Sequence, residues 1–290
     1  MFTRRVIFNP NYAATNGLAV VSPLPDGQWR ITATLRHISS VPTREQLQLI
    51  LSERGPRTSW VELGPPSVAG RYRIQPTVAA SLRASRVLLA GDAAHTFSPA
   101  TAQGINTGIA DAANLGWKLA TLLRGVGQDC LLDSYDIERR QAALDAVKRT
   151  EQHSNGLSTS NLLVRGIRDT LGLLADKVER LRLPMTEGLA GFDTRYEAGL
   201  LGPGHQVRGW GEVGERVEQL PAELSGRGTF RLLSSDRSES AWLKKNSPVA
   251  GLWELKSAFL QLAQGAALVR PDNHIAWLGS KNSSPIQVSC

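Results

Sequence analysis

The chain has 290 residues, of which 41% are hydrophobic and 20% are charged, and its formal net charge is +7 at pH 7. That length allows about two domains with a sizeable core, so stability requires neither a disulfide nor a metal. No stretch approaches the ~18 consecutive apolar residues of a membrane span, and the first ten residues lack an apolar signal sequence, which predicts a cytoplasmic protein with no membrane partner.

The positive charge is scattered along the sequence. Its densest clusters, such as Arg139 and Arg140, stand among acidic residues and read as solvated helix faces, so we expect no nucleic-acid partner. The two cysteines, Cys130 and Cys290, offer no zinc-binding spacing, and no metal site is expected.

The first part of the chain reads as strands with one helix. Residues 18–35 predict a hairpin, because two strand-like runs flank the turn signal Pro25-Asp26-Gly27. Thr43 and Gln46 have the spacing of a capping box and predict the start of a short helix.

The next part changes in pattern. Residues 87–90 are apolar at every position, which is typical of a strand buried on both faces of a parallel sheet. A helix is predicted to begin near Asn106 or Thr107 and to end at Gly125. Its apolar residues form one stripe, typical of a helix that packs along one face: Ile105, Ile109, Ala112, Leu119 and Leu123.

A second helix is predicted from about residue 133 to 152, and helical periodicity continues to about residue 195. The run Gly202-Pro203-Gly204 then marks a domain boundary near residue 198. The remainder contains a strand, a helix and a final strand pair, which predicts a small α/β domain. The sequence as a whole therefore predicts an α/β (α+β) fold.

Asp92 follows the apolar strand directly. Ligands of open α/β sheets bind at the carboxyl ends of strands, and a carboxylate there can accept hydrogen bonds from sugar-alcohol hydroxyls. Further on, Gly104 permits close backbone approach, and the amides near Ile105 and Asn106 would face a ligand at the positive end of the helix dipole. This pattern indicates a site for an electron-rich ring that becomes anionic on reduction.

These residues lie in one motif, GDAAHTFSPATAQGINTGIADAANLGWKL, at positions 91–119. It resembles the second flavin motif of the class A flavoprotein monooxygenases, the FAD-dependent aromatic hydroxylases of the para-hydroxybenzoate hydroxylase fold, especially those acting on polyketides and phenols. The resemblance continues through Ser134-Tyr135, residues 138–140, residues 189–196, residues 269–272 and Ala276-Trp277, and so covers most of the chain.

The resemblance implies a partial hydroxylase fold in three domains. Residues 1–83 would be the remainder of the substrate-binding sheet, residues 84–197 the flavin-contacting strand and helices, and residues 198–290 a thioredoxin-like domain. One departure stands out, because Thr101-Ala102 replaces a glycine-rich pair that the family often carries.

The resemblance also implies roles for single residues. Asp92 would hold the ribityl chain of FAD, and the Pro99 backbone would border the flavin face that reacts with oxygen. No side-chain base can be assigned. The other residues implied to contact FAD are Gly91, Ala102, Gln103, Gly104, Ile105 and Asn106.

The reaction implied is that of the family. NAD(P)H reduces FAD, and one oxygen atom of O2 passes to an electron-rich ring of an aromatic or polyketide-type small molecule. The cofactor carries this chemistry, and the protein supplies position and a water-poor pocket.

Polar residues near the motif admit plainer interpretations. His95 reads as a structural hydrogen-bonding residue rather than a proton carrier. Asp111 and Asn114 read as residues that fix helix packing or the turn, with a direct contact to flavin or substrate as the alternative. Arg139 and Arg140 read as a solvated helix face.

The family begins with a strand, a GxGxxG turn and a helix, and no such arrangement precedes residue 86. A GxGxxG does occur at Gly209, Gly211 and Gly214, but no buried strand precedes it and Pro221 would interrupt the helix, so we do not interpret it as a dinucleotide site. If three to five hydrogen bonds of about 1 kcal/mol each are missing, FAD binds roughly a hundredfold to several thousandfold more weakly.

Two hypotheses follow. In the first, the chain is the flavin-contacting and carboxyl-terminal part of a working monooxygenase, and it is either complemented by a separately encoded Rossmann half or truncated by a misplaced start. The protein partner expected is such a Rossmann half or, alternatively, further copies of the chain in a homo-oligomer. In the second, it is a non-catalytic homologue that acts as an interaction or regulatory partner. Unless another chain covers it, the apolar strand would expose its surface and unpaired edge to water.

Overall fold

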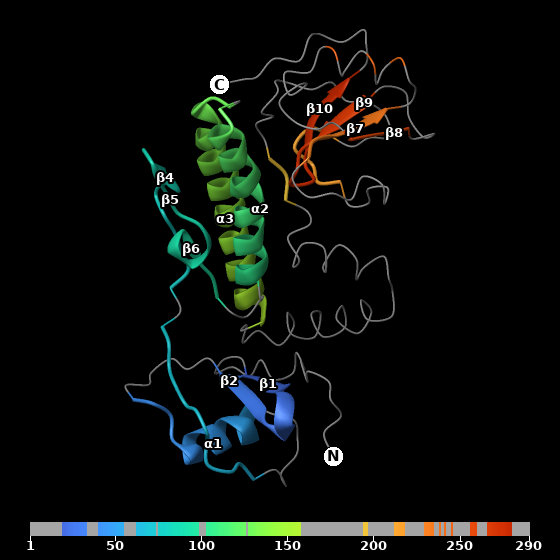
Figure 1. The fold of residues 1–290 in the computed structure, drawn as a ribbon. Helices are drawn as coiled ribbons and strands as arrows, with labels where there is room; N and C mark the ends of the chain where they lie inside the picture. The colour runs from blue at the N-terminus through green and yellow to red at the C-terminus, as the bar shows by residue number, and fades with distance from the viewer. Residues whose placement is uncertain are drawn as a thin grey trace. The chain divides into compact units, whose positions relative to one another are not determined.

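The computed structural model describes residues 19–33, 40–54, 62–73, 75–98, 103–125, 127–157, 194–196, 212–217, 229–234, 256–259 and 266–279, with residues 238, 241 and 245. The chain divides into two compact units (Figure 1). One comprises Met1–Gln75 and Arg149–Pro184, and the other comprises Pro76–Lys148 and Met185–Cys290. We call them the first and the second unit.

The amino-terminal segment of the first unit contains, among its described residues, a hairpin and a helix. Strand β1 (Ala19–Pro23) pairs antiparallel with β2 (Trp29–Ala33), and the turn between them contains a short 3-10 helix, η2 (Pro25–Gly27). Helix α1 (Arg44–Arg54) begins with the predicted capping box, in which the Gln46 side chain accepts a hydrogen bond from the Thr43 backbone at 3.0 Å. Both sequence predictions for this region are confirmed.

The second unit begins with short antiparallel pairs. Strand β3 (Thr77–Val78) pairs with β6 (His95–Thr96), and β4 (Arg83–Ala84) pairs with β5 (Val87–Leu88). The 3-10 turn η3 (Gly91–Ala93) follows β5.

The predicted parallel strand over residues 87–90 is wrong in length and in pairing. Ser85 adopts a positive φ of 56°, so the chain reverses tightly and β5 pairs with its sequence neighbour. Leu88 and Leu89 pack against Leu82, Ala94 and Tyr135, whereas the Val87 side chain is exposed.

Two long helices, α2 (Gln103–Leu123) and α3 (Cys130–Leu157), lie side by side in Figure 1. Helix α2 begins three or four residues earlier than predicted. It ends as predicted, since Gly125 takes the left-handed φ of 71° and its N–H bonds the Leu122 carbonyl at 2.8 Å.

The carboxyl-terminal strands form one sheet with the order β10-β9-β7-β8. Strand β7 (Arg231–Ser234) is parallel to β8 (Lys256–Phe259), and β9 (Ala266–Val269) is antiparallel to both β7 and β10 (Ile275–Gly279). A parallel pair needs a crossover connection, whereas β9 and β10 are joined by a short turn.

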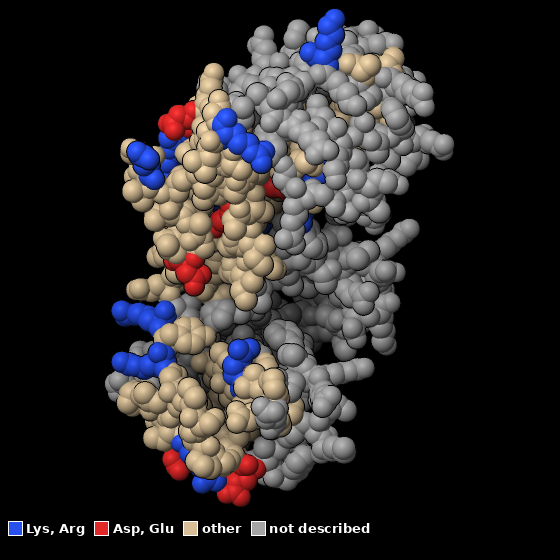
Figure 2. Space-filling view, in the orientation of Figure 1, with Lys and Arg blue, Asp and Glu red and all other residues tan. Residues whose placement is uncertain are grey.

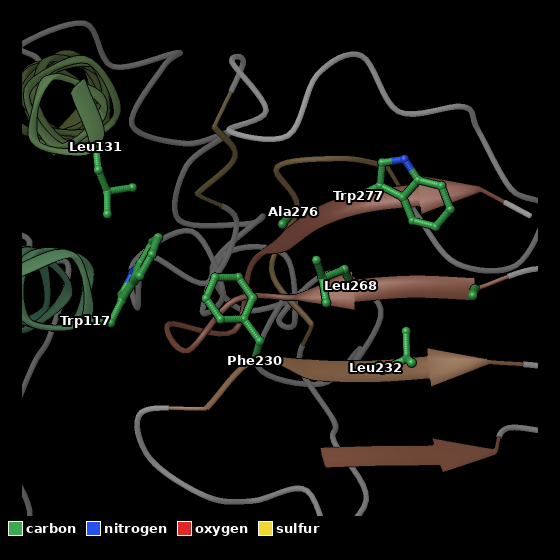
Figure 3. Close-up of a cluster of buried hydrophobic side chains, with 8 residues drawn as sticks. Trp117, Leu131, Phe230, Leu232, Leu268, Ala276 and Trp277 are labelled. Carbon is green, nitrogen blue, oxygen red and sulfur yellow. The ribbon is translucent and has the colours of Figure 1, made fainter. Parts of the chain in front are cut away.

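A hydrophobic cluster joins this sheet to the two helices (Figure 3). The edge of the Phe230 ring meets the face of Trp117 from α2, with ring centroids 5.5 Å apart and planes at 86°. The other buried members of the cluster are Leu131, Leu232, Ala266, Leu268, Ala276 and Trp277. The carboxyl-terminal sheet therefore shares a core with α2 and α3.

None of the described helices is long and apolar enough to cross a membrane. On the face seen in Figure 2, acidic and basic side chains are interspersed over the described surface.

Candidate functional site

The predicted cofactor carboxylate lies on the surface of a tight turn. Gly91 has a φ of 60°, which favours glycine, and its carbonyl accepts a hydrogen bond from the Ala94 N–H at 2.8 Å. Ala94 in turn accepts a bond from the Ala79 N–H at 2.8 Å, which fixes the end of the turn to the neighbouring chain. The Asp92 side chain is exposed and can reach a ligand.

The start of α2 packs against this turn. A Cβ added at Gly108 would meet the Gly91 Cα at 3.5 Å, and one added at Gly104 would meet the Phe97 ring at 3.6 Å. The N–H groups of the first helical turn have no acceptor within the helix, and they carry the positive end of its dipole. The structure thus brings Gly91 and Asp92 close to the start of α2.

Side chains in this first turn divide between the core and the surface. Gln103 is buried, whereas Ile105 and Asn106 are exposed, as a residue that meets a ligand must be. The predicted site residues Pro99 and Ala102 lie outside the described residues.

Asp111 lies beneath the turn and is completely buried. Its Oδ2 atom accepts hydrogen bonds from the Gly91 N–H at 2.9 Å and from Nε2 of His95 at 2.6 Å. Its Oδ1 atom accepts a bond from Nε of Arg139 at 2.8 Å. Burial opposes ionisation of Asp111, but the bonds from His95 and Arg139 hold the pKa of its carboxyl below the ordinary value.

The interpretation of Arg139 as part of a solvated face is wrong. Its side chain is 2% exposed and ion-paired, and only Arg140 is partly exposed. The sequence did contain a signal, because Tyr135, Arg139, Ala142 and Ala146 follow the i, i+4, i+7, i+11 spacing of one helix face. The three apolar members of that face are buried.

A second buried network surrounds Glu138. Its carboxylate accepts bonds from both terminal nitrogens of Arg270, at 2.7 and 2.9 Å, and from Nζ of Lys118 at 2.9 Å. Asn114 donates to Glu138 at 2.7 Å and to Asp272 at 3.2 Å. These contacts bind the turn between β9 and β10 to both helices.

The charges of this network alter its titration. Burial alone would raise the pKa of Glu138, but Arg270 and Lys118 lower it to about 2. Burial lowers the pKa of Lys118 to about 8, against the opposing effect of Glu138. Ionised Glu138 therefore stabilises the fold only while its cationic partners are in place.

Tyr196 connects the two networks. Its hydroxyl accepts a bond from Nη1 of Arg139 at 3.2 Å, and its ring lies 4.2 Å from the His274 ring and 5.0 Å from the Arg270 guanidinium. The sequence prediction that Asp111 and Asn114 fix helix packing or the turn agrees with these contacts.

The predicted apolar stripe of α2 is largely exposed. Ile105 is 77%, Ile109 is 64% and Leu123 is 87% exposed. The face that α2 buries is mostly polar instead: Gln103, Asp111, Asn114, Trp117, Lys118 and Thr121. An exposed apolar stripe of this length is typical of a surface that another segment covers.

Gly214 is the last glycine of the GxGxxG pattern that we do not interpret as a dinucleotide site, and its role is in packing. Its φ is 87°, and a Cβ there would lie 1.9 Å from the Tyr196 carbonyl oxygen. Its own N–H bonds the Ile275 carbonyl at 2.9 Å. Close backbone packing accounts for this glycine; Gly209 and Gly211 lie outside the described residues.

Comparisons with known proteins point to one class. Residues 40–150 match the FAD binding domain family. The rifampicin monooxygenase of Rhodococcus hoagii is 32% identical over 222 residues, which are 74% of this chain and 43% of that protein. The 3-(3-hydroxy-phenyl)propionate/3-hydroxycinnamic acid hydroxylase of Mycobacterium avium is 41% identical over 128 residues, 44% of this chain and 22% of that protein.

Solved structures agree with the sequence comparisons. CabE, an aromatic hydroxylase from angucycline biosynthesis, superposes with a TM-score of 0.67 at 26% identity, covering 92% of this chain and 57% of that one. The chain is thus a relative of the class A FAD-dependent aromatic monooxygenases, with their para-hydroxybenzoate hydroxylase-like fold. FAD is the cofactor of the domain family that residues 40–150 match.

Three curated relatives match this chain over most of its length. The chain in turn spans only about half of each relative, namely 43%, 53% and 54% of their lengths.

Proposed function

We propose that this chain is the flavin-contacting and carboxyl-terminal part of an FAD-dependent monooxygenase. It would hydroxylate an aromatic or polyketide-type small molecule, with NAD(P)H as the reductant and O2 as the source of oxygen. The observation that carries the proposal is the exposed Asp92 on the Gly91–Ala93 turn, packed beside the start of α2 and inside the region that matches the FAD binding domain.

The residues present fit FAD in chemistry. Asp92 is an acceptor for the ribityl hydroxyls, and the positive end of the α2 helix dipole favours negative charge on a reduced ring. A Cβ added at Gly108 would lie within van der Waals contact of Gly91, so the turn and the helix start are close together. Bound FAD supplies the redox chemistry, while the protein orients the ring and excludes water. Within this proposal, Ile105, Asn106, Ala102 and the Pro99 backbone complete the contacts, and Gln103, whose side chain is buried, would contribute through its backbone only.

The exposed apolar side chains support a further part of the proposal. Val87 of β5 and the α2 stripe are apolar and exposed to solvent. We propose that a Rossmann-type nucleotide-binding half packs against them, either as a further segment of the same chain or as a separate protein. The relatives contain about twice the length that this chain spans, which is room for such a half.

We also propose the three-domain division at residues 83 and 197. The β10-β9-β7-β8 order, with one parallel pair and one antiparallel hairpin, supports a thioredoxin-like carboxyl-terminal domain.

Titration of FAD onto the purified chain tests the function. The titration is run on the chain alone and on the chain mixed with the amino-terminal half of a full-length relative. Asp92→Ala removes hydrogen bonds to a charged acceptor and should weaken FAD binding about 10- to 100-fold. Asp145→Asn is the matched control, because Asp145 is a half-exposed carboxylate on α3 whose pairing with Lys148 is a loose 3.9 Å contact.

The NADPH oxidation rate of the mixture, measured with aromatic substrates, then tests the enzyme activity. If the wild-type chain retains no FAD alone or in the mixture, the monooxygenase proposal is wrong. A non-catalytic partner role would then be the better account.

A further inference from the structure

The Gly91–Ala93 turn depends on a contact from outside its own sequence. It is a single 3-10 turn, and such short turns are not stable by themselves. The N–H of Gly91, the first of the turn, donates to the carboxylate of Asp111, which is 20 residues further along the sequence. The second contact comes from His95, just after the turn, and reaches the same oxygen atom. One buried oxygen therefore holds both ends of the turn.

The protonation of this contact follows from its geometry. Nε2 of His95 lies 2.6 Å from the ionised carboxylate, so it carries the proton and donates. The Nδ1 atom of the same ring is buried and has no hydrogen-bond partner among the residues that the structure describes. The tautomer that fits this contact therefore carries a proton on Nε2.

The Asp111 side chain is itself fixed from α3. Arg139 neutralises its charge, and the same guanidinium donates to the Thr107 carbonyl at 3.2 Å and to the Tyr196 hydroxyl at 3.2 Å. Thr107 belongs to the start of α2, so Arg139 contacts both the helix start and the residue that holds the turn. Because Asp111 and Arg139 are 0% and 2% exposed, water cannot replace either partner.

We propose that Asp111 is a positioning residue for the cofactor turn, that His95 and Arg139 fix its orientation, and that Tyr196 anchors Arg139 to the carboxyl-terminal region. The proposal rests on the proposed function in one respect, namely that the Gly91–Ala93 turn contacts FAD. Asp111 would not touch the cofactor; it would set the direction of Asp92 relative to the start of α2, where errors of about 0.5 Å already matter.

Asp111→Asn tests the proposal with two readouts. The first needs no cofactor: amide hydrogen exchange at Gly91 in the apo chain should become at least about tenfold faster, because its acceptor loses its charge. The second is FAD binding, where we expect about tenfold weaker affinity and an altered visible circular dichroism spectrum of the bound flavin. Glu138→Gln is the matched control, since it removes a buried, ion-paired carboxylate of the same unit that does not contact the turn.

Two variants at His95 test the same proposal even if Asp111→Asn does not fold. His95→Gln can place an N–H donor near the position of Nε2 and should keep the wild-type exchange rate and spectrum. His95→Leu has no donor and should reproduce the Asp111→Asn effects.

The outcomes separate the two proposals. If the wild-type chain binds no FAD but Asp111→Asn still speeds Gly91 exchange, the proposed function fails, whereas the role of Asp111 in holding the turn stands. If Gly91 exchange is unchanged in Asp111→Asn, or if Glu138→Gln changes it equally, the positioning role is overturned. It is also overturned if His95→Gln and His95→Leu behave alike.

Discussion

Single residues in this chain often have roles that their type alone does not reveal. Gly214 is the clearest case. It belongs to a pattern associated with nucleotide binding, yet its carbonyl bonds the Tyr196 N–H at 3.1 Å and its N–H bonds Ile275. It joins three segments at a point where there is no space for a side chain.

Gly214→Ala should therefore lower the free energy of unfolding of the second unit by at least about 3 kcal/mol, because alanine is strained at positive φ and its Cβ would overlap the Tyr196 carbonyl. Gly116→Ala is the control. That glycine lies in α2 with nothing within 4 Å of an added Cβ, so alanine should stabilise by about 0.5–1 kcal/mol. Urea unfolding followed by tryptophan fluorescence measures both; equal effects of the two substitutions would contradict the packing role of Gly214.

At the scale of elements, α2 and α3 are held together largely by buried charges. Lys118 and Asn114 of α2 meet Glu138 of α3, and Arg270 enters from the turn after β9. Removing one partner of such a network leaves an uncompensated buried charge, which typically costs about 3–5 kcal/mol.

The network predicts a specific pH dependence. The folded-state pKa of Glu138, about 2, is below its ordinary value of 4.5, so its contribution is complete above pH 4.5 and is lost as the pH falls towards 2. That contribution is about 3 kcal/mol. In unfolding titrations from pH 6 to pH 3, the wild-type chain should lose stability more steeply than Glu138→Gln, whereas Asp145→Asn should follow the wild type. Parallel curves for the wild type and Glu138→Gln would contradict this account.

Sequence patterns predicted local features well and these networks poorly. The capping box at Thr43, the turn at residues 25–27 and the end of α2 at Gly125 depend on neighbouring residues, and the structure confirms them. The partners of Asp111 and Glu138 come from positions 16 to 132 residues away. Pairings at such separations are visible only in the folded chain, so a polar buried face and an apolar exposed face of α2 could not be predicted.

At the scale of the whole molecule, the exposed stripe of α2 is the feature on which the proposed contact with a Rossmann-type half depends. Ile109 and Leu123 are mainly exposed, and surface substitutions usually change stability by no more than about 0.5 kcal/mol.

Ile109→Lys and Leu123→Lys should therefore leave the unfolding free energy of the chain nearly unchanged. In a mixture with a Rossmann-type half, the same variants should weaken association at least about tenfold, because a charge would be buried in the contact. Sedimentation velocity measures the association, and Gln141→Lys, at an exposed position of α3, is the control for added positive charge. If the variants destabilise the isolated chain by several kcal/mol, the stripe is already packed in it.

The central claim is that the Gly91–Ala93 turn and the start of α2 together bind a flavin. Hydrogen exchange on the full chain, with and without saturating FAD and in the presence of the complementing half, tests it most directly. We expect FAD to slow exchange in peptides covering residues 88–96 and 103–110, while strands β9 and β10 show no change. Protection confined to other segments, or equal protection in Asp92→Ala and the wild type, would contradict the claim.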